Sequence, residues 1–127
     1  MRAGAGDDAV AGGPGRDMLD GESGTDDLHG GGGADKLVGG GGDDDVSGGS
    51  GANVLNGDAG NDSIGGGPSG DRIDGGKGSD VVKAGAGNDS VSARDRRRDR
   101  INCGPGRDTV RADRKDVLRG CERRRVR

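Results

Sequence analysis

Aspartate recurs at a regular interval through most of this 127-residue chain. Only Glu22 and Glu122 among the 23 acidic residues are Glu, and this bias toward the shorter acid indicates a positional role. Calcium takes about six to eight oxygen ligands from carboxylates and backbone carbonyls, whereas transition metals prefer His or Cys. Residues 3–92 contain one His, His29, and no Cys. The residue types therefore favour a hard cation such as Ca²⁺.

Each of these Asp residues belongs to a nine-residue unit that usually begins with Gly. Ten units run without a gap from position 3 to 92, followed by a ten-residue variant at 93–102 and a last unit at 103–111. Position six is an oxygen-bearing side chain in every unit: Asp8, Asp17, Asp26, Asp35, Asp44, Asn53, Asp62, Asp71, Asp80, Asp89, Asp99 and Asp108. A repeat of this kind predicts a solenoid, in which each turn contacts only its neighbours.

Position eight of every unit is a single large aliphatic residue: Val10, Leu19, Leu28, Leu37, Val46, Leu55, Ile64, Ile73, Val82, Val91, Ile101 and Val110. An aliphatic residue between two variable ones indicates a very short strand with one side chain pointing inward. The Gly-rich start allows a tight turn because Gly adopts positive φ at little steric cost. One unit cannot bury its aliphatic side chain alone, but stacked units can.

Composition alone leaves disorder open as an alternative. The chain has 32 Gly, no aromatic residue and only 26% hydrophobic residues, and low hydrophobicity with many charges is typical of disordered segments. Random low complexity would not keep Asp and an aliphatic residue in phase through twelve units. We therefore expect an ordered chain that something other than a large hydrophobic core holds together.

The pattern GGxGxDxUx, with U a large aliphatic residue, resembles the RTX or hemolysin-type calcium-binding nonapeptide, and the resemblance covers residues 3–111. It implies an all-β fold, a right-handed parallel β-roll or β-solenoid with 18-residue turns. It also implies several calcium ions in rows along both edges, each held by Asp residues of successive turns and by loop carbonyls. The family is bacterial and secreted, so the resemblance implies an extracellular protein.

The resemblance divides the position-six residues into two ladders of implied calcium ligands. Odd-numbered units supply Asp8, Asp26, Asp44, Asp62, Asp80 and, less surely, Asp99. Even-numbered units supply Asp17, Asp35, Asn53, Asp71, Asp89 and Asp108.

Three units depart from the pattern. Asn53 keeps an oxygen but loses the charge, and the unit GGPSGDRID puts Ser69 where a Gly with positive φ is expected. We expect weak or vacant sites around Asn53 and Asp71. The unit 93–102 contains no Gly and carries Arg96, Arg97 and Arg98, so we expect it to bind calcium poorly.

Folding should depend on the metal. The repeats offer few apolar side chains against the conformational entropy of ordering a Gly-rich backbone. Stacked carboxylates also repel one another until a cation separates them. Metal binding and folding are then one event, with a disordered metal-free chain and a β-rich calcium form.

Charge is distributed unevenly along the chain. Residues 1–92 hold 17 acidic and 6 basic residues, a net charge of −11, whereas residues 93–127 hold 6 acidic and 14 basic residues, a net charge of +8. We divide the chain into a roll at 1–111, with 93–102 irregular, and an Arg-rich C-terminal cap at 112–127. The cap would cover the end of the solenoid.

Cys103 and Cys121 are too far apart for a zinc pattern and leave two alternatives, free thiols or a disulfide. A disulfide is favoured if the protein is exported, and it would tie the last coil to the tail. The CGPGRD…C ending also resembles the ends of some secreted calcium-repeat proteins.

The leading functional hypothesis is an extracellular calcium-binding repeat protein with a structural or calcium-responsive role. The first alternative is a calcium-dependent secretion or folding module of a larger exported enzyme, toxin or adhesin. A weaker alternative is binding of a polyanion or cell surface through the Arg-rich segment; no aromatic residue or motif indicates specific nucleic-acid binding. No apolar run suits a membrane helix or signal peptide. The sequence shows no nucleophile accompanied by a base and an orienting partner, so we do not expect an enzyme.

Overall fold

Every regular element of the described chain is a β-strand. The computed structural model describes residues 1–121 and 123–126, with the last four described by their backbone only. The odd-numbered strands are β1 (Ala9–Gly13), β3 (Asp27–Gly31), β5 (Asp45–Gly49), β7 (Ser63–Gly67), β9 (Val81–Gly85), β11 (Arg100–Asn102) and β13 (Val117–Arg119). The even-numbered strands are β2 (Met18–Asp20), β4 (Lys36–Val38), β6 (Val54–Asn56), β8 (Arg72–Asp74), β10 (Ser90–Ala93), β12 (Thr109–Ala112) and β14 (Arg123–Val126).

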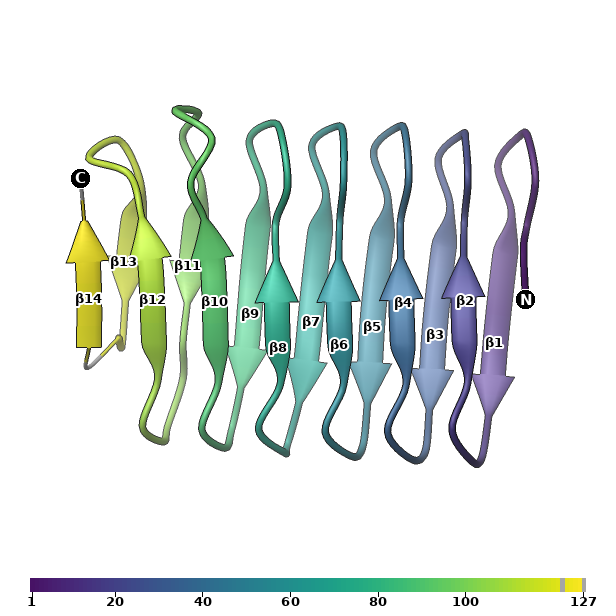
Figure 1. Ribbon diagram of the computed structural model, residues 1–127, viewed down its shortest axis with the longest axis horizontal. Coiled ribbons are helices and arrows are strands. Elements are labelled where there is room, and N and C mark those ends of the chain that lie inside the picture. The colour runs from purple at the N-terminus through teal and green to yellow at the C-terminus, as the bar shows by residue number, and fades with distance from the viewer. Residues whose placement is uncertain (122, 127) are drawn as a thin grey trace.

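These strands form two parallel sheets that face each other (Figure 1). One sheet has the order β1-β3-β5-β7-β9-β11-β13 and the other β14-β12-β10-β8-β6-β4-β2. The chain therefore alternates between the sheets. Val10 pairs with Leu28 and Leu28 with Val46, so one turn is 18 residues, or two of the nine-residue units. This confirms the expected parallel β-solenoid.

The core is a double row of aliphatic side chains, one from each strand from β1 to β13. Position-eight residues from Leu19 to Val110 are almost completely buried, and Val10 packs against them partly buried in the first turn. Their strand neighbours point outward because successive side chains of a strand alternate between its faces. Met18, for example, is 67% exposed beside Leu19 at 2%. One aliphatic residue per unit is therefore enough to fill the narrow space between the sheets.

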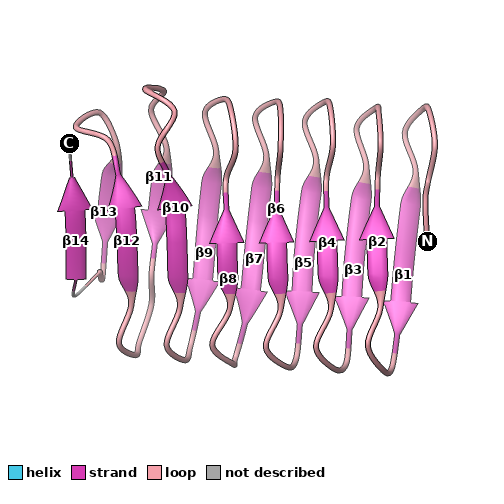
Figure 2. Ribbon diagram, viewed as in Figure 1, coloured by secondary structure: helices cyan, strands magenta, loops and turns pink. Residues whose placement is uncertain are grey.

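Gly-rich loops join the sheets at both edges (Figure 2). In the loop before β4, Gly31 and Gly33 have φ of 96° and 101°. A Cβ on Gly33 would also lie only 2.2 Å from the carbonyl oxygen of Gly15 in the preceding turn. Gly is needed at this position both for its conformation and for the close stacking of turns. Glu22 and Asp58 adopt positive φ without being Gly, and the side chains of Asp20 and Asn56 accept their N–H groups.

The sheets continue beyond residue 111. Strand β13 pairs with β11 and strand β14 with β12, within the segment expected to be a cap. Cys103 and Cys121 form a disulfide with a Cα–Cα distance of 5.1 Å, so the thiol alternative is wrong. The bond joins the loop after β11 to the loop after β13, the strand that pairs with β11. The division into a roll and a C-terminal cap stays a prediction.

Candidate metal sites in two aspartate rows

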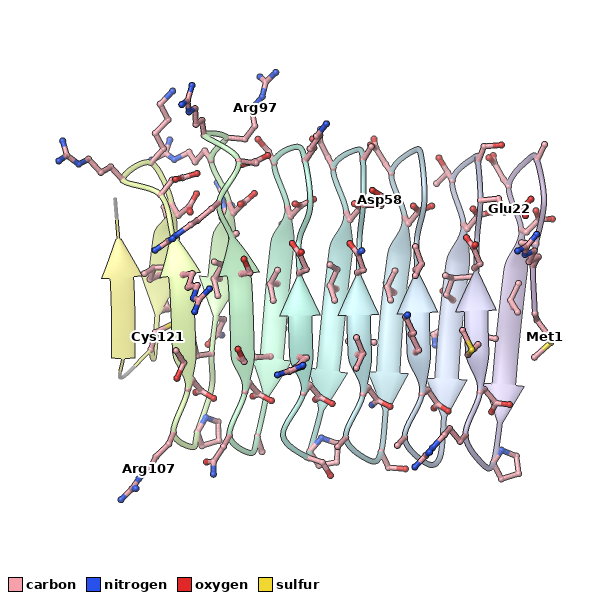
Figure 3. All side chains as sticks on the ribbon, viewed as in Figure 1. Met1, Glu22, Asp58, Arg97, Arg107 and Cys121 are labelled. Carbon is pink, nitrogen blue, oxygen red and sulfur yellow. A yellow bond between two sulfur atoms is a disulfide. The ribbon has the colours of Figure 1, made fainter. Side chains whose placement is uncertain are left out.

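The position-six residues lie in two rows, one along each edge of the solenoid. Loops that lead into odd-numbered strands carry Asp8, Asp26, Asp44, Asp62, Asp80 and Asp99 at the upper edge of Figure 3. Loops that lead into even-numbered strands carry Asp17, Asp35, Asn53, Asp71, Asp89 and Asp108 at the lower edge. The two rows correspond to the two expected ladders, and the occupancy of each position by calcium stays a prediction.

After the first residue of each row, one side-chain oxygen of every row residue builds the row itself. Asp26 Oδ1 accepts the backbone N–H of Asp8, and Asp44 Oδ1 accepts that of Asp26, both at 2.9 Å. The same bond links each later pair in both rows at 2.6–2.9 Å. The bond holds the side chain in a fixed rotamer over the turn before it. One side-chain oxygen is thereby committed to the backbone.

The other oxygen is buried and accepts no hydrogen bond from any described group. This is true of Oδ2 in Asp8, Asp17, Asp26, Asp35, Asp44, Asp62, Asp71, Asp80, Asp89, Asp99 and Asp108. Buried polar atoms nearly always have a partner, and a buried charge needs one most of all. Each of these oxygens is therefore a site for a cation or for a proton.

Burial changes the proton affinity of these carboxyls. The pKa of Asp62 rises to about 7, mainly because of burial; the backbone hydrogen bond lowers it, and the neighbouring carboxylates Asp80 and Asp44 add to the rise. Burial similarly raises the pKa of Asp89 and Asp99 to about 7. The pKa values of Asp44 and Asp80 rise to about 6 for the same main reason. A positive ligand would offset both the burial and the repulsion.

The free oxygen lies against the first Gly of its own unit. A Cβ on Gly30 would lie 2.6 Å from Asp35 Oδ2 and 2.6 Å from the carbonyl oxygen of Gly48 in the next turn. Gly12, Gly21, Gly39, Gly57, Gly66 and Gly75 have the same relation to the Oδ2 of their own units, at 2.5–2.7 Å. In all of these units except that of Gly75, the absent Cβ leaves a polar cradle between turns, lined by a carboxylate oxygen and a carbonyl oxygen.

Asn53 differs from the Asp residues in this position. Its Oδ1 accepts the N–H of Asp35 at 2.9 Å, as a row member should. Its Nδ2 donates to the carbonyl oxygens of Gly49 at 3.2 Å and Gly51 at 3.1 Å. The second atom of the position-six side chain therefore faces the carbonyls at positions two and four of its own loop.

The donor set fits calcium. Among residues 1–121, no three Asp, Glu, His or Cys side chains come together to hold a metal ion. A cation in these loops would therefore take carboxylate oxygens from the row and backbone carbonyls for the remainder. Calcium accepts such all-oxygen, irregular ligand sets, whereas zinc and copper prefer sites that include nitrogen or sulfur ligands.

The other two irregular units keep their place in the rows. Asp71 Oδ1 accepts the N–H of Asn53 at 2.8 Å, and Ser69 avoids the positive φ expected for its position. In the Gly-free unit, Arg96 takes positive φ (70°), and Asp99 Oδ1 accepts the N–H of Asp80 at 2.6 Å. Their weak or absent calcium binding stays a prediction.

Asp116 extends the upper row by one member, and sequence reasoning missed it. Its Oδ1 accepts the N–H of Asp99 at 2.9 Å, and its Oδ2 accepts the N–H of Asp113 at 2.6 Å. No Gly-rich start marks this unit, so the repeat pattern did not predict Asp116 as a row member. The available signal was Leu118, which follows Asp116 at the spacing that separates position six from position eight.

One family model matches the chain. The RTX calcium-binding nonapeptide repeat, described in four copies, matches residues 2–37, 38–68 and 65–95. The chain has no match among curated proteins or among solved structures.

Proposed function

The chain belongs to the RTX calcium-binding nonapeptide repeat family, and from this premise we propose that calcium held between its stacked loops drives its folding. The observation that carries the proposal is the set of eleven buried Asp Oδ2 atoms that accept no hydrogen bond from the described residues. Such atoms are too costly to leave charged and unpartnered in a protein with so small a core. Calcium supplies the compensating positive charge.

The residues that would hold the ions are the members of the two rows. Each Asp offers Oδ2, while Oδ1 keeps the loop in register with its neighbour. The Gly-rich loops offer carbonyl oxygens at positions two and four, the positions that Asn53 Nδ2 contacts in its own loop. Ions along a row would join the turns that the aliphatic core alone holds weakly. Metal affinity then appears as folding free energy.

We propose that the protein works outside the cell. Its family is typically secreted, and weak oxygen-ligand sites fill at the millimolar calcium concentrations found there. The described residues form no helix that is long and apolar enough to cross a membrane. The role would be structural or calcium-responsive.

We propose a non-catalytic role as well. His29, the only His of the chain, is exposed on β3, with Nε2 2.9 Å from Asp27 Oδ1. Both Cys residues are in the disulfide. These contacts account for the side chains that most often act as nucleophile or base.

A calcium titration of the full chain tests the proposal. Circular dichroism should show a disordered spectrum after metal removal and a β-rich spectrum with calcium, and calorimetry should detect several ions per chain. Magnesium at the same concentration should substitute poorly, because it demands a regular octahedral shell and dehydrates reluctantly. An unchanged β spectrum after exhaustive chelation, with no heat on adding calcium, would overturn the proposal.

A second candidate function is polyanion binding. Arg94, Arg96, Arg97 and Arg98 are exposed on the loop between β10 and β11, and Arg97 projects from the upper edge in Figure 3. The tail side chains that also suggested this function lie outside the described residues. Salt-dependent retention on heparin, reduced by Arg97→Gln with Arg98→Gln, would support the function. Retention unchanged in that variant would remove this loop from consideration.

A further inference from the structure

We propose that the side-chain amide of Asn53 takes the place of a calcium ion, so that one turn of the lower row closes without metal. The inference rests on the proposed function, because it concerns which loops of this chain need calcium. It goes beyond a weakened site: the loop of Asn53 would have no site to fill.

Asn53 Nδ2 occupies the position that Oδ2 occupies in the other loops. A Cβ on Gly48 would lie 2.6 Å from Asn53 Nδ2. In seven Asp units, a Cβ on the first Gly would lie 2.5–2.7 Å from Oδ2 of the Asp in the same unit. The two flanking row contacts are also kept, because Asn53 accepts from Asp35 at 2.9 Å and donates its backbone N–H to Asp71 at 2.8 Å. The substitution therefore changes one atom and leaves the row intact.

The backbone around that atom is the same in the loop of Asn53 as in a loop with Asp. Gly49 and Gly51 have φ of 83° and 92°, and their counterparts one turn earlier in the same row, Gly31 and Gly33, have φ of 96° and 101°. The carbonyls at positions two and four therefore face the second side-chain atom in both kinds of loop.

The chemistry at that point is opposite in the two cases. The amide of Asn carries two N–H donors, and Asn53 uses them on the carbonyls of Gly49 and Gly51. An ionised Asp presents only acceptors, so its Oδ2 meets carbonyl oxygens with no hydrogen between them. A cation is needed to bring those oxygens together, whereas Asn53 brings its loop together by itself.

This arrangement divides the lower row. The carboxylates of Asp17 and Asp35 lie on one side of Asn53, and those of Asp71, Asp89 and Asp108 lie on the other. Calcium bound in one group is separated from calcium in the other by a neutral turn that keeps its shape. The upper row has no such neutral member between Asp8 and Asp99.

The test is a gain of binding. Asn53→Asp restores the carboxylate, and calorimetry with equilibrium dialysis should count one more calcium ion per chain than in the wild type. The calcium dependence of folding, followed by circular dichroism, should become steeper by the same one ion. Asn56→Asp is the matched control: it makes the same change in the same unit, at a position where Asp20 and Asp74 accept the same turn hydrogen bond. Its ion count should not change.

A second variant keeps the inference testable if Asn53→Asp does not fold. Asn53→Ala removes both donors, and it should weaken folding in calcium without changing the number of bound ions. One ion fewer in Asn53→Ala, or no additional ion in a folded Asn53→Asp, would overturn the inference while leaving the proposed function intact. A wild-type chain that binds no calcium would overturn both.

Discussion

The row Asp residues up to Asp108 and the last member of the upper row, Asp116, satisfy their carboxylates in different ways. From Asp8 to Asp108 the second oxygen of each row Asp is buried without a described donor, and residues 1–92, which hold most of these Asp, carry a net charge of −11. Asp116 accepts backbone N–H groups through both oxygens, and residues 93–127 carry a net charge of +8. A disulfide also ties the later turns together.

A buried loop carboxylate can be stabilised in two ways in this fold. A buried carboxylate needs positive partners, which can be a cation or a set of N–H donors. A cation makes the turn a binding site and its stability conditional, whereas donors make the turn permanent and remove the site. The Asp residues of the consensus units leave one oxygen for a cation, whereas Asn53 and Asp116 use both side-chain atoms in hydrogen bonds.

The largest expected effect concerns the backbone that the Gly-rich turns require. Gly33→Ala should destabilise the calcium form by about 2–5 kcal/mol, because a left-handed Ala costs about 1–2 kcal/mol and its Cβ would also clash with the backbone of Gly15. Gly32→Ala is the control, since its Cβ would meet nothing closer than Ser50 Oγ at 3.6 Å. Denaturant unfolding in excess calcium measures both. Equal stability of the two variants would contradict the close stacking of turns.

The disulfide should have the next largest effect. Replacing Cys103 and Cys121 together by Ser should lower the free energy of unfolding by about 3 kcal/mol for a loop of this size. The number of calcium ions in the turns before Cys103 should not change, because the bond joins only residues 103 and 121. A variant that loses ions would show that the later turns support binding in the earlier ones.

The same substitution should have opposite outcomes in the two regions. Asp116→Asn places an amide N–H₂ against a backbone N–H, and it should cost about 1–3 kcal/mol with an unchanged calcium count. Asp62→Asn should imitate Asn53, with one ion fewer and a folded chain in calcium. Each variant serves as the control for the other. A lost ion in Asp116→Asn with none lost in Asp62→Asn would reverse the comparison.

Protons should partly replace calcium in the earlier turns. The pKa of Asp62 rises from its ordinary 3.8 to about 7 in the fold, so the metal-free fold binds protons more tightly than the unfolded chain. Its stability is therefore greatest below about pH 4 and is lost as the pH rises through 7. Calcium-free protein should show more β signal by circular dichroism at pH 5 than at pH 8. More β signal at pH 8 would contradict the burial of these carboxyls.

The nine-residue period was enough to predict a solenoid of short strands, and the family resemblance implied its 18-residue turns. Asp and an aliphatic residue in constant phase indicated an inward side chain in each unit, and Val10, Leu28 and Val46 do pair in register across successive turns. The two ladders came from the two-unit turn that the resemblance implies, because alternate units then lie at opposite edges.

The details of the site depended on individual atoms that no period encodes. The commitment of Oδ1 to the backbone N–H of the preceding turn, and the donation from Asn53 Nδ2 to Gly49 and Gly51, follow from rotamers set by packing. Asp116 was missed because its unit lacks Gly. Ser69 was expected to need a positive φ, but its turn takes a different path to the same carboxylate position.

The 18-residue register makes the length of this molecule independent of its cross-section. Deleting one full turn would shorten both sheets by a strand and leave every remaining side chain on the face it has now. Deleting a single nine-residue unit would instead exchange the sheets for everything downstream and move each later carboxylate to the opposite edge. Insertions and deletions in such a chain are therefore best tolerated as whole 18-residue turns, and evolution can change the number of turns without changing the fold of each turn.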